Sequence, residues 1–264
     1  MNFMKRLHAI ESNLLSAKKT TIFGKELYLY DCIDSTNILA RQMALNGAEE
    51  GTVVAALSQQ SGKGRLGRSF QSLPGGLYFS VILRPSMKDQ TDILKLTSLI
   101  AVAAAGAIEE IFPVSIGIKW VNDLYIDTKK TGGILCEASY SHQAGPDFVI
   151  GGIGINVQAV DFSGELTSIA TSLETETGIK KAPTELLLPL LSHLEALYPT
   201  LHDNHFLEEA KRRSVLLGKD IIVHENGIDY PARAVDIDTL GRLIISVSGK
   251  TKTLCSGEVS VHLM

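Results

Sequence analysis

Short apolar runs alternate with longer stretches of helical periodicity over the first 217 residues of the chain. The short runs are rich in β-branched and aromatic residues and lie between turn-forming residues, which is typical of strands; they cover 25–33, 52–57, 77–83, 116–120, 124–127, 133–141 and 147–157. The longer stretches repeat apolar residues at helical spacing and predict helices at 3–16, 38–45, 91–111, 183–198 and 203–213. Because most successive strands are joined by short turns, antiparallel pairing is favoured over a series of βαβ crossovers.

This pattern predicts two domains. Residues 1–217 are expected to form an α+β domain, in which helices pack on one side of a mixed, mainly antiparallel sheet. From Gly218 the chain changes to short strands separated by glycine turns such as Asn226-Gly227 and Gly241-Arg242. Strands at this spacing are typical of a small β barrel, which we expect over residues 218–264.

Composition narrows the class of protein. The 264 residues are 45% hydrophobic and carry a formal net charge of −4, so a sizeable core is expected and general nucleic-acid binding is not. Cys32, Cys136 and Cys255 lack the spacing of a zinc site or a disulfide framework and indicate a reduced, cytoplasmic setting. The first residues lack the apolar core of a signal peptide. The most apolar stretch, Leu96–Ile108, is shorter than the roughly 20 residues of a membrane span.

The segment 59–76 contains glycines at the spacing G-x-G-x-x-G, as Gly62-Lys63-Gly64-Arg65-Leu66-Gly67. That spacing after a strand suggests a dinucleotide-binding fold only if a helix begins at the loop and holds a pyrophosphate at its N-terminus. Here the sequence continues through Ser69–Gly76, which includes Pro74 and cannot form a regular helix. A dinucleotide site is therefore disfavoured.

The same loop carries three cations, Lys63, Arg65 and Arg68, within six residues. Glycine allows the backbone to approach a ligand closely, and the planar guanidinium of arginine matches phosphate or carboxylate. The loop could wrap an anionic ligand, or it could be a solvated basic turn. The loop alone does not decide between these two readings.

A second candidate site is Lys119-Trp120-Val121-Asn122-Asp123-Leu124, which begins at the end of an apolar strand. A lysine at such a position needs a partner or a function. It could neutralise charge while a carboxylate attacks a phosphate, or it could form a salt bridge with Asp123 or another carboxylate. Glycines also interrupt the strands at 130–137 and 150–157, where they indicate either a bulge or close backbone approach by a ligand or a strand.

Taken together and in order, these segments resemble the biotin protein ligases: Asp34-Ser35-Thr36-Asn37, Gln59–Arg68, Lys119–Leu124, Gly132–Leu135 and Gly152–Asn156. The resemblance covers about residues 27–160 strongly. It extends more loosely through the C-terminal barrel, which is similar to the small SH3-like domain of that family. The fold that it implies for the larger domain is the class II synthetase or biotin ligase-like sheet.

The resemblance implies a two-step reaction that uses ATP, biotin and Mg²⁺. The biotin carboxylate would attack the α-phosphate of ATP to give biotinyl-5′-AMP, and a lysine of a carrier protein would then take the biotinyl group. The implied partner is the biotin carboxyl carrier protein or domain of acetyl-CoA carboxylase or a related carboxylase, and the implied activity is that of a biotin–[biotin carboxyl-carrier protein] ligase.

The family's roles transfer to matching positions of this sequence. Lys119 and Arg65 match the catalytic positions. The biotin-binding positions are matched by Ser35, Thr36, Asn37, Gln59, Gly62, Lys63, Gly64, Arg65, Lys119 and Gly133. The ATP and adenylate positions are matched by Arg65, Arg68, Phe70, Lys119, Asn122 and Asn156, and Asp123 is the candidate metal ligand.

Several departures and alternatives accompany this interpretation. Lys63 stands where the family commonly has arginine, which removes a bidentate fork, and Phe70 stands where tryptophan is frequent. Only the short predicted helix at 3–16 precedes the first motif, so we expect the monofunctional class, without DNA binding and without membrane association. Edge strands could pair in a homodimer. The rival functions are a lipoate or octanoate ligase of the same fold and a non-enzymatic biotin sensor.

Overall fold

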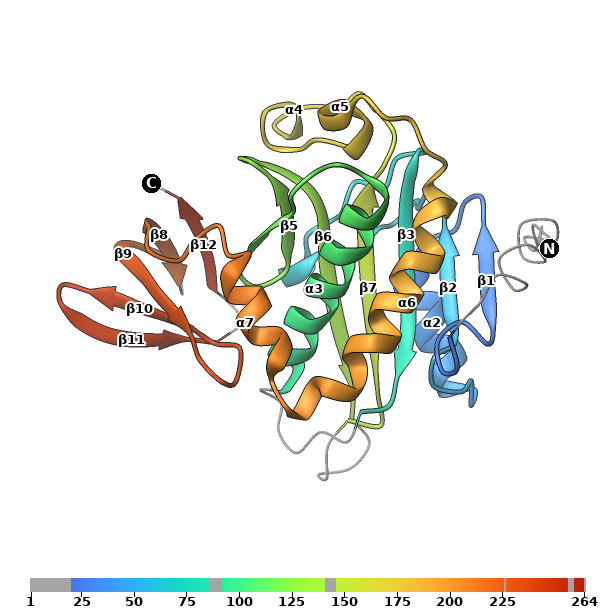
Figure 1. Cartoon of the computed structure of the whole chain (residues 1–264), viewed down its shortest axis with the longest axis horizontal. Coiled ribbons are helices and arrows are strands. Elements are labelled where there is room, and N and C mark those ends of the chain that lie inside the picture. The colour runs from blue at the N-terminus through green and yellow to red at the C-terminus, as the bar shows by residue number, and fades with distance from the viewer. Residues whose placement is uncertain (1–19, 86–91, 141–145, 226, 256–258, 264) are drawn as a thin grey trace.

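The computed structural model describes residues 20–85, 92–140, 146–225, 227–255 and 259–263. The helix expected at 3–16 lies outside these residues. Figure 1 shows two sheets, a large one with helices packed against it and a smaller C-terminal one beside it. Within the described ranges, no helix is long and apolar enough to cross a membrane.

The larger sheet has seven strands in the order β1-β2-β3-β7-β6-β5-β4. Their bounds are Leu27–Tyr30 (β1), Val53–Ala56 (β2), Gly76–Leu83 (β3), Gly117–Lys119 (β4), Asp123–Ile126 (β5), Lys129–Ser139 (β6) and Phe148–Asn156 (β7). β1 pairs with β2 in parallel, and every other neighbouring pair in this sheet is antiparallel. The expected mixed, mainly antiparallel sheet is thus confirmed.

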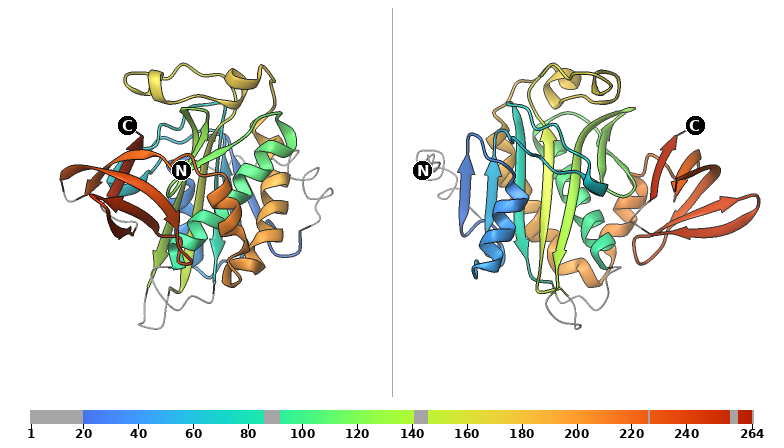
Figure 2. Two further views of the ribbon diagram at one scale, coloured as in Figure 1. Left: turned by 60° about the vertical axis from the view of Figure 1, so that its left-hand side comes forward. Right: turned by 180° about the vertical axis from the view of Figure 1, so that it is seen from behind.

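Helices cover both faces of this sheet, although the sequence predicted them on one side. α3 (Asp92–Ile111) and α6 (Leu187–Leu197) pack on one face and α7 (His205–Arg212) lies against α3, whereas α2 (Thr36–Leu45) packs on the opposite face against β2, β3 and β7 (Figures 1 and 2). Successive side chains of a strand point to opposite faces, so β2 serves both layers: Val53 belongs to the main core and Val54 to the core beneath α2. An all-apolar strand gives no alternation from which this second layer could be predicted.

The main core lies between the sheet and α3. The helix is buried along most of its length, and its alanine-rich middle contributes Ala101 and Ala103 at 0% exposure. Small side chains allow the helix to lie close to the strands and to α6. The helix expected at 183–198 is shorter in the structure, because a 3-10 turn at Pro183–Leu186 precedes α6 and another at Tyr198–His202 follows it. The short helices α4 (Leu166–Ile169) and α5 (Leu173–Thr177) were not predicted.

The C-terminal sheet has five antiparallel strands in the order β11-β10-β9-β8-β12. Their bounds are Asp220–Glu225 (β8), Ile228–Ile237 (β9), Leu243–Val247 (β10), Lys250–Leu254 (β11) and Val259–Leu263 (β12). β11 was not predicted, because its sequence Lys-Thr-Lys-Thr-Leu has only one large apolar residue. The short strands that were expected in the C-terminal part of the chain are thus present as one antiparallel sheet.

The two sheets share a second hydrophobic core. Trp120 and Val121, which follow β4 directly, are buried together with Ile221, Ile245 and other apolar residues of the C-terminal sheet. The indole Nε1 of Trp120 also donates a hydrogen bond of 3.0 Å to the carbonyl of Gly241. Trp120 therefore packs between the two sheets.

Candidate active site

One cavity of about 190 Å³ brings together residues from both sheets. Its lining comes from the start of α2, from the loop that follows β2, from the strands β4, β5, β6 and β7, and from β12 of the C-terminal sheet. The predicted site residues that line it are Ser35, Thr36, Asn37, Gln59, Lys63, Gly64, Arg65, Arg68, Phe70, Lys119, Asn122, Asp123 and Gly133. Gly62 and Asn156 are absent from this lining. Segments that are more than 220 residues apart in the sequence, from Ser35 to His262, thus meet at one place, at the end of β4 and the N-terminus of α2.

A hydrogen-bonded network holds the start of α2 in the cavity. Gln59 accepts hydrogen bonds from the backbone N–H of Thr36 at 2.8 Å and from its hydroxyl at 3.1 Å. The hydroxyl of Ser80 donates to Thr36 Oγ1 at 2.7 Å and lies 2.6 Å from Asn37 Oδ1. Asn37 in turn donates to Glu137 Oε2 at 2.8 Å. The amide of Asn37 is therefore occupied at both ends by protein partners, and it fixes α2 against β3 and β6.

The basic loop folds back on itself without a regular helix after the glycines. Gly64 N–H donates to the carbonyl of Arg68 at 2.8 Å, and Phe70 N–H donates to that of Gly62 at 2.9 Å. Only a three-residue 3-10 turn, Arg65–Gly67, lies between them, with Leu66 at φ 57°. The loop thus lacks the helix N-terminus that a dinucleotide fold requires. Gly62 serves the folding of the loop, because a Cβ there would lie 2.2 Å from Ser72 Oγ.

Lys119 lies at the end of β4, with its ammonium 5.6 Å from the centre of the Tyr125 ring. Burial lowers the pKa of Lys119, and the charge of Asp123 partly opposes this while Lys130 adds to it. In the described part of the chain, the ion pair of Asp123 is with Lys130, at 2.7 Å, rather than with Lys119. Of the alternative readings of Lys119, the salt bridge with Asp123 is therefore not formed.

Arg65 extends from the basic loop across the cavity to the segment after β4. Its Nη1 donates a hydrogen bond of 3.1 Å to Asn122 Oδ1, and the amide of Asn122 donates to the carbonyl of Ile134 at 3.1 Å. Burial is the main cause of a lowered pKa at Arg65, against the influence of Asp123. The loop is thus joined to the segment after β4 by a hydrogen bond from Arg65 to an uncharged acceptor, which leaves the positive charge of Arg65 available to a ligand.

The glycines of β7 give space to side chains of the site. A Cβ at Gly152 would lie 2.1 Å from Asn37 Oδ1, and one at Gly154 would lie 2.8 Å from the ring of Phe70. The close approach that the glycines indicated is therefore made by these two side chains above the sheet. Asn156, at the end of the same strand, is 7% exposed and donates to the carbonyl of Thr171 at 3.0 Å. It fixes the segment before α5, away from the cavity lining.

The charges of the cavity are strongly unequal. Among the described residues that line it, the cations are Lys63, Arg65, Arg68, Lys119 and Lys130, and the carboxylate is Asp123. Lys119 and Arg65 are partly buried, whereas Lys63 and Arg68 are exposed. Such an excess of positive charge favours a ligand with several negative charges. The described residues include no group of three histidine, cysteine or acidic side chains that could hold a metal ion.

Sequence reasoning did not find His262, which lines the cavity from β12 together with Trp120 and Leu135. A single histidine near the end of a chain with seven histidines carries no local signal. Its position follows only from the packing of the C-terminal sheet against β4.

Comparison with known proteins gives a consistent result. Residues 29–156 match the Biotin/lipoate A/B protein ligase family. The bifunctional ligase/repressor BirA of Bacillus subtilis is 34% identical over 257 residues, which cover 95% of this chain and 78% of that protein. The biotin–[acetyl-CoA-carboxylase] ligase of Mycobacterium tuberculosis is 30% identical over 243 residues, which cover 87% of this chain and 86% of the relative.

A solved structure agrees with these relatives. The biotin protein ligase from Aquifex aeolicus in complex with biotin and ATP has a TM-score of 0.79 and 30% identity, and the match covers 91% of this chain and all of that one. The fold and the cavity define a member of the Biotin/lipoate A/B protein ligase family. Within that family the chain belongs to the biotin protein ligases and is an enzyme.

Proposed function

We propose that this protein joins biotin to a lysine of a biotin carboxyl carrier protein in two steps within the cavity. In the first step the biotin carboxylate attacks the α-phosphate of ATP, and pyrophosphate leaves with the electrons of the broken bond. In the second step the amine of the carrier lysine attacks the carbonyl of biotinyl-5′-AMP, AMP leaves, and the amine loses a proton. The convergence of an excess of cations with the polar N-terminus of α2 in one cavity carries this proposal.

The residues suggest how the two substrates are arranged. Ser35 and Thr36 present backbone and hydroxyl groups of the kind that a ureido ring can bond. Lys119 would neutralise the biotin carboxylate and the α-phosphate as they approach, since a desolvated cation stabilises negative charge strongly. Arg65 would retain the adenylate and Arg68 would hold the pyrophosphate side. The Aquifex aeolicus relative, described as a complex with biotin and ATP, supports this pair of substrates.

Mg²⁺ is proposed to enter with ATP. A magnesium ion in a nucleotide site commonly keeps several waters and takes only one or two carboxylates besides the phosphates. Asp123 is the carboxylate that lines the cavity, and Lys130 holds one of its oxygens at 2.7 Å. The donor set fits a metal carried by the triphosphate. Asp123 would then supply one oxygen or a contact through water.

The proposed acceptor is the biotin carrier domain of acetyl-CoA carboxylase, as the name of the Mycobacterium tuberculosis relative suggests. The test is mass spectrometry of a purified carrier domain after incubation with biotin, Mg²⁺–ATP and this protein. We expect one biotinyl group on the carrier lysine, and none on a carrier in which that lysine is replaced by arginine. An unmodified carrier together with rapid formation of free adenylate would refute the acceptor but not the first step.

The two rival functions are distinguished by separate measurements. A lipoate or octanoate ligase would be stabilised thermally by lipoate or octanoate and not by biotin, whereas we expect stabilisation by biotin alone. A sensor without turnover would bind biotin but release no pyrophosphate from ATP. We expect biotin-dependent release of pyrophosphate from the wild-type chain.

A further inference from the structure

The C-terminal sheet contributes a side chain to the cavity. His262 lies on β12, opposite Ile222 of β8, and it is the described residue of this sheet that lines the cavity. The other residues of the lining come from the larger sheet, from α2 and from the connections of that domain, and they include Lys119 and Arg68. β12 therefore places the imidazole of His262 in the same cavity lining as Lys119 and Arg68, the two cations that are proposed to bind phosphate.

The surroundings of His262 favour its neutral form. Burial lowers the pKa of His262, and the positive charges of Lys119 on β4 and Arg68 on the basic loop lower it further. On the side of the C-terminal sheet, Asp229 of β9 raises the pKa of His262 and His224 of β8 lowers it. An ordinary histidine has a pKa near 6.5, so a shift in this direction favours the uncharged imidazole at neutral pH.

The second step of the proposed reaction needs a proton acceptor. The lysine amine attacks in its neutral form, and its nitrogen becomes positively charged as the bond to carbon forms, so one proton must leave to give the amide. The lysines and arginines of the cavity cannot accept that proton while they are charged. Asp123 is held by Lys130, and Glu137 is bonded to Asn37 outside the cavity lining. An uncharged imidazole is the group in this lining that suits the task.

We propose that His262 is the catalytic base of the transfer step, an inference that rests on the proposed function. The carrier amine attacks the carbonyl carbon of biotinyl-5′-AMP, and the bond from that carbon to the phosphate oxygen breaks. AMP leaves with the electron pair of that bond. His262 takes the proton from the nitrogen of the new amide and passes it to solvent. No other reactant is consumed.

The test separates the two half-reactions. ATP–pyrophosphate exchange measures formation of the adenylate, and rapid mixing of purified biotinyl-5′-AMP with a carrier domain measures transfer. General bases contribute about 10²- to 10⁴-fold, so we expect His262→Gln to slow transfer at pH 7 by about 10²-fold and to lower exchange much less. The transfer rate of the wild type should increase as the pH rises through the pKa of His262. This increase should be absent from the pH profile of His262→Gln.

Two further variants exclude a purely structural role. Added imidazole should restore part of the transfer rate of His262→Ala, which a loss of packing alone would not allow. His202→Gln, an exposed histidine in the 3-10 turn that follows α6, should keep the wild-type pH profile. An equal loss in both half-reactions, an unchanged pH profile in His262→Gln, or no rescue by imidazole would overturn the assignment. A wild-type chain that forms no adenylate would overturn the proposed function, and that result is visible before any variant is made.

Discussion

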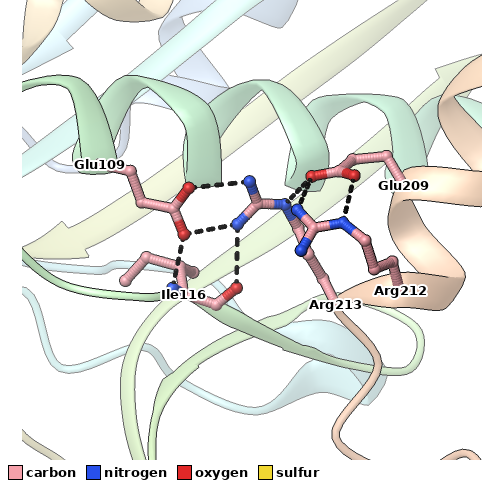
Figure 3. Close-up of polar contacts among 5 residues, drawn as sticks. All are labelled: Glu109, Ile116, Glu209, Arg212 and Arg213. Carbon is pink, nitrogen blue, oxygen red and sulfur yellow. Dashed lines mark hydrogen bonds and ion pairs between the residues drawn. The ribbon is translucent and has the colours of Figure 1, made fainter.

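The two ends of β4 carry opposite arrangements of charge. Just before the strand, Arg213 donates to Glu109 through both terminal nitrogens, at 2.5 and 2.8 Å, to Glu209 at 2.6 Å and to the carbonyl of Ile116 at 3.2 Å (Figure 3). Arg212 completes this cluster on Glu209. Two arginines thus meet two carboxylates, and the side chain of Arg213 is only 10% exposed.

At the other end of the strand, the cations of the cavity outnumber the carboxylates. Lys119 and Arg65 are partly buried, and among the described residues of the lining the carboxylate of Asp123 pairs with Lys130 rather than with either of them. Burial is the main cause of their lowered pKa values. Buried charges that are matched hold elements together, whereas buried charges that are unmatched cost stability unless a ligand neutralises them. We infer that the Arg213 cluster holds β4 in position, and that the unmatched cations at the other end of β4 serve to bind a ligand.

The largest effect is expected when a cation of the cavity is removed. Lys119→Met should lower the rate of ATP–pyrophosphate exchange by about 10²- to 10³-fold, since electrostatic contacts with the transition state contribute on that order. The free energy of unfolding in urea should stay the same or rise, because a desolvated charge is lost. Lys129→Met, an exposed lysine at the start of β6, is the control. Activity that survives in Lys119→Met would show that the neutralising group is elsewhere.

The reverse outcome is expected for the matched cluster. Arg213→Met should lower the free energy of unfolding by about 3–5 kcal/mol, because it leaves a partly buried carboxylate without its partner. Exchange activity per folded molecule, measured at low temperature, should fall by much less than in Lys119→Met. Arg212→Met removes a cation that is 68% exposed and should cost less than about 1 kcal/mol. Equal losses in the two arginine variants would contradict the role given to Arg213.

An intermediate effect is expected from the loop. Arg65→Gly should let biotinyl-5′-AMP escape about 10- to 100-fold faster, since hydrogen bonds to charged groups contribute about 1.5–3 kcal/mol. The escaped adenylate should then label lysines of a bystander protein, which is detected by streptavidin blotting. Tight retention of the adenylate by Arg65→Gly would show that another side chain holds it.

The cluster also predicts a dependence of stability on pH. Hydrogen bonds from Arg212, together with those from Arg213, lower the pKa of Glu209 to about 2. A lowered pKa in the folded state means that this stabilisation is complete above the ordinary glutamate pKa and is lost as the pH falls from about 4.5 toward 2. Unfolding experiments across that range should show a smaller loss of stability in Glu209→Gln than in the wild type. A parallel decline in both proteins would count against the cluster as the acid-sensitive group.

The smallest effect concerns Lys63, which stands at the edge of the cavity. Lys63→Arg restores a planar fork at an exposed position, where an ion pair contributes at most about 1 kcal/mol. The half-life of the bound adenylate should therefore lengthen by no more than about fivefold. A shorter half-life would mean that the lysine is adapted to this loop.

The sequence was sufficient for most of the sheet and for the positions that form the cavity. Apolar runs marked the strands, and the motifs around Thr36, Arg65 and Lys119 do converge. What it could not give was the long-range packing. Because every residue of β2 is apolar, its sequence did not show that helices pack on both faces of the sheet. The strand β11 was missed because its polar sequence has no alternation of apolar and polar residues.

Single polar residues were also assigned by motif where packing decides their position. Asn156 belongs to a glycine-rich motif, but the carbonyl of Thr171 turns its amide away from the cavity lining. His262 has no motif at all, and only the docking of β12 brings it to the site. Local sequence patterns therefore found the residues that neighbour each other in a loop or strand, and they missed those that a second sheet supplies.

The apolar pair after Lys119 has a consequence for how the protein is made. Trp120 and Val121 are buried by residues that lie beyond position 215, which the ribosome delivers about a hundred residues later. Domains generally fold as they emerge, from the N-terminal end, so the larger sheet can form while these two side chains still face water. The end of β4, which carries Lys119, is therefore among the last parts of the molecule to be completed. A nascent chain thus contains the sequence motifs of the active site before the site itself is assembled.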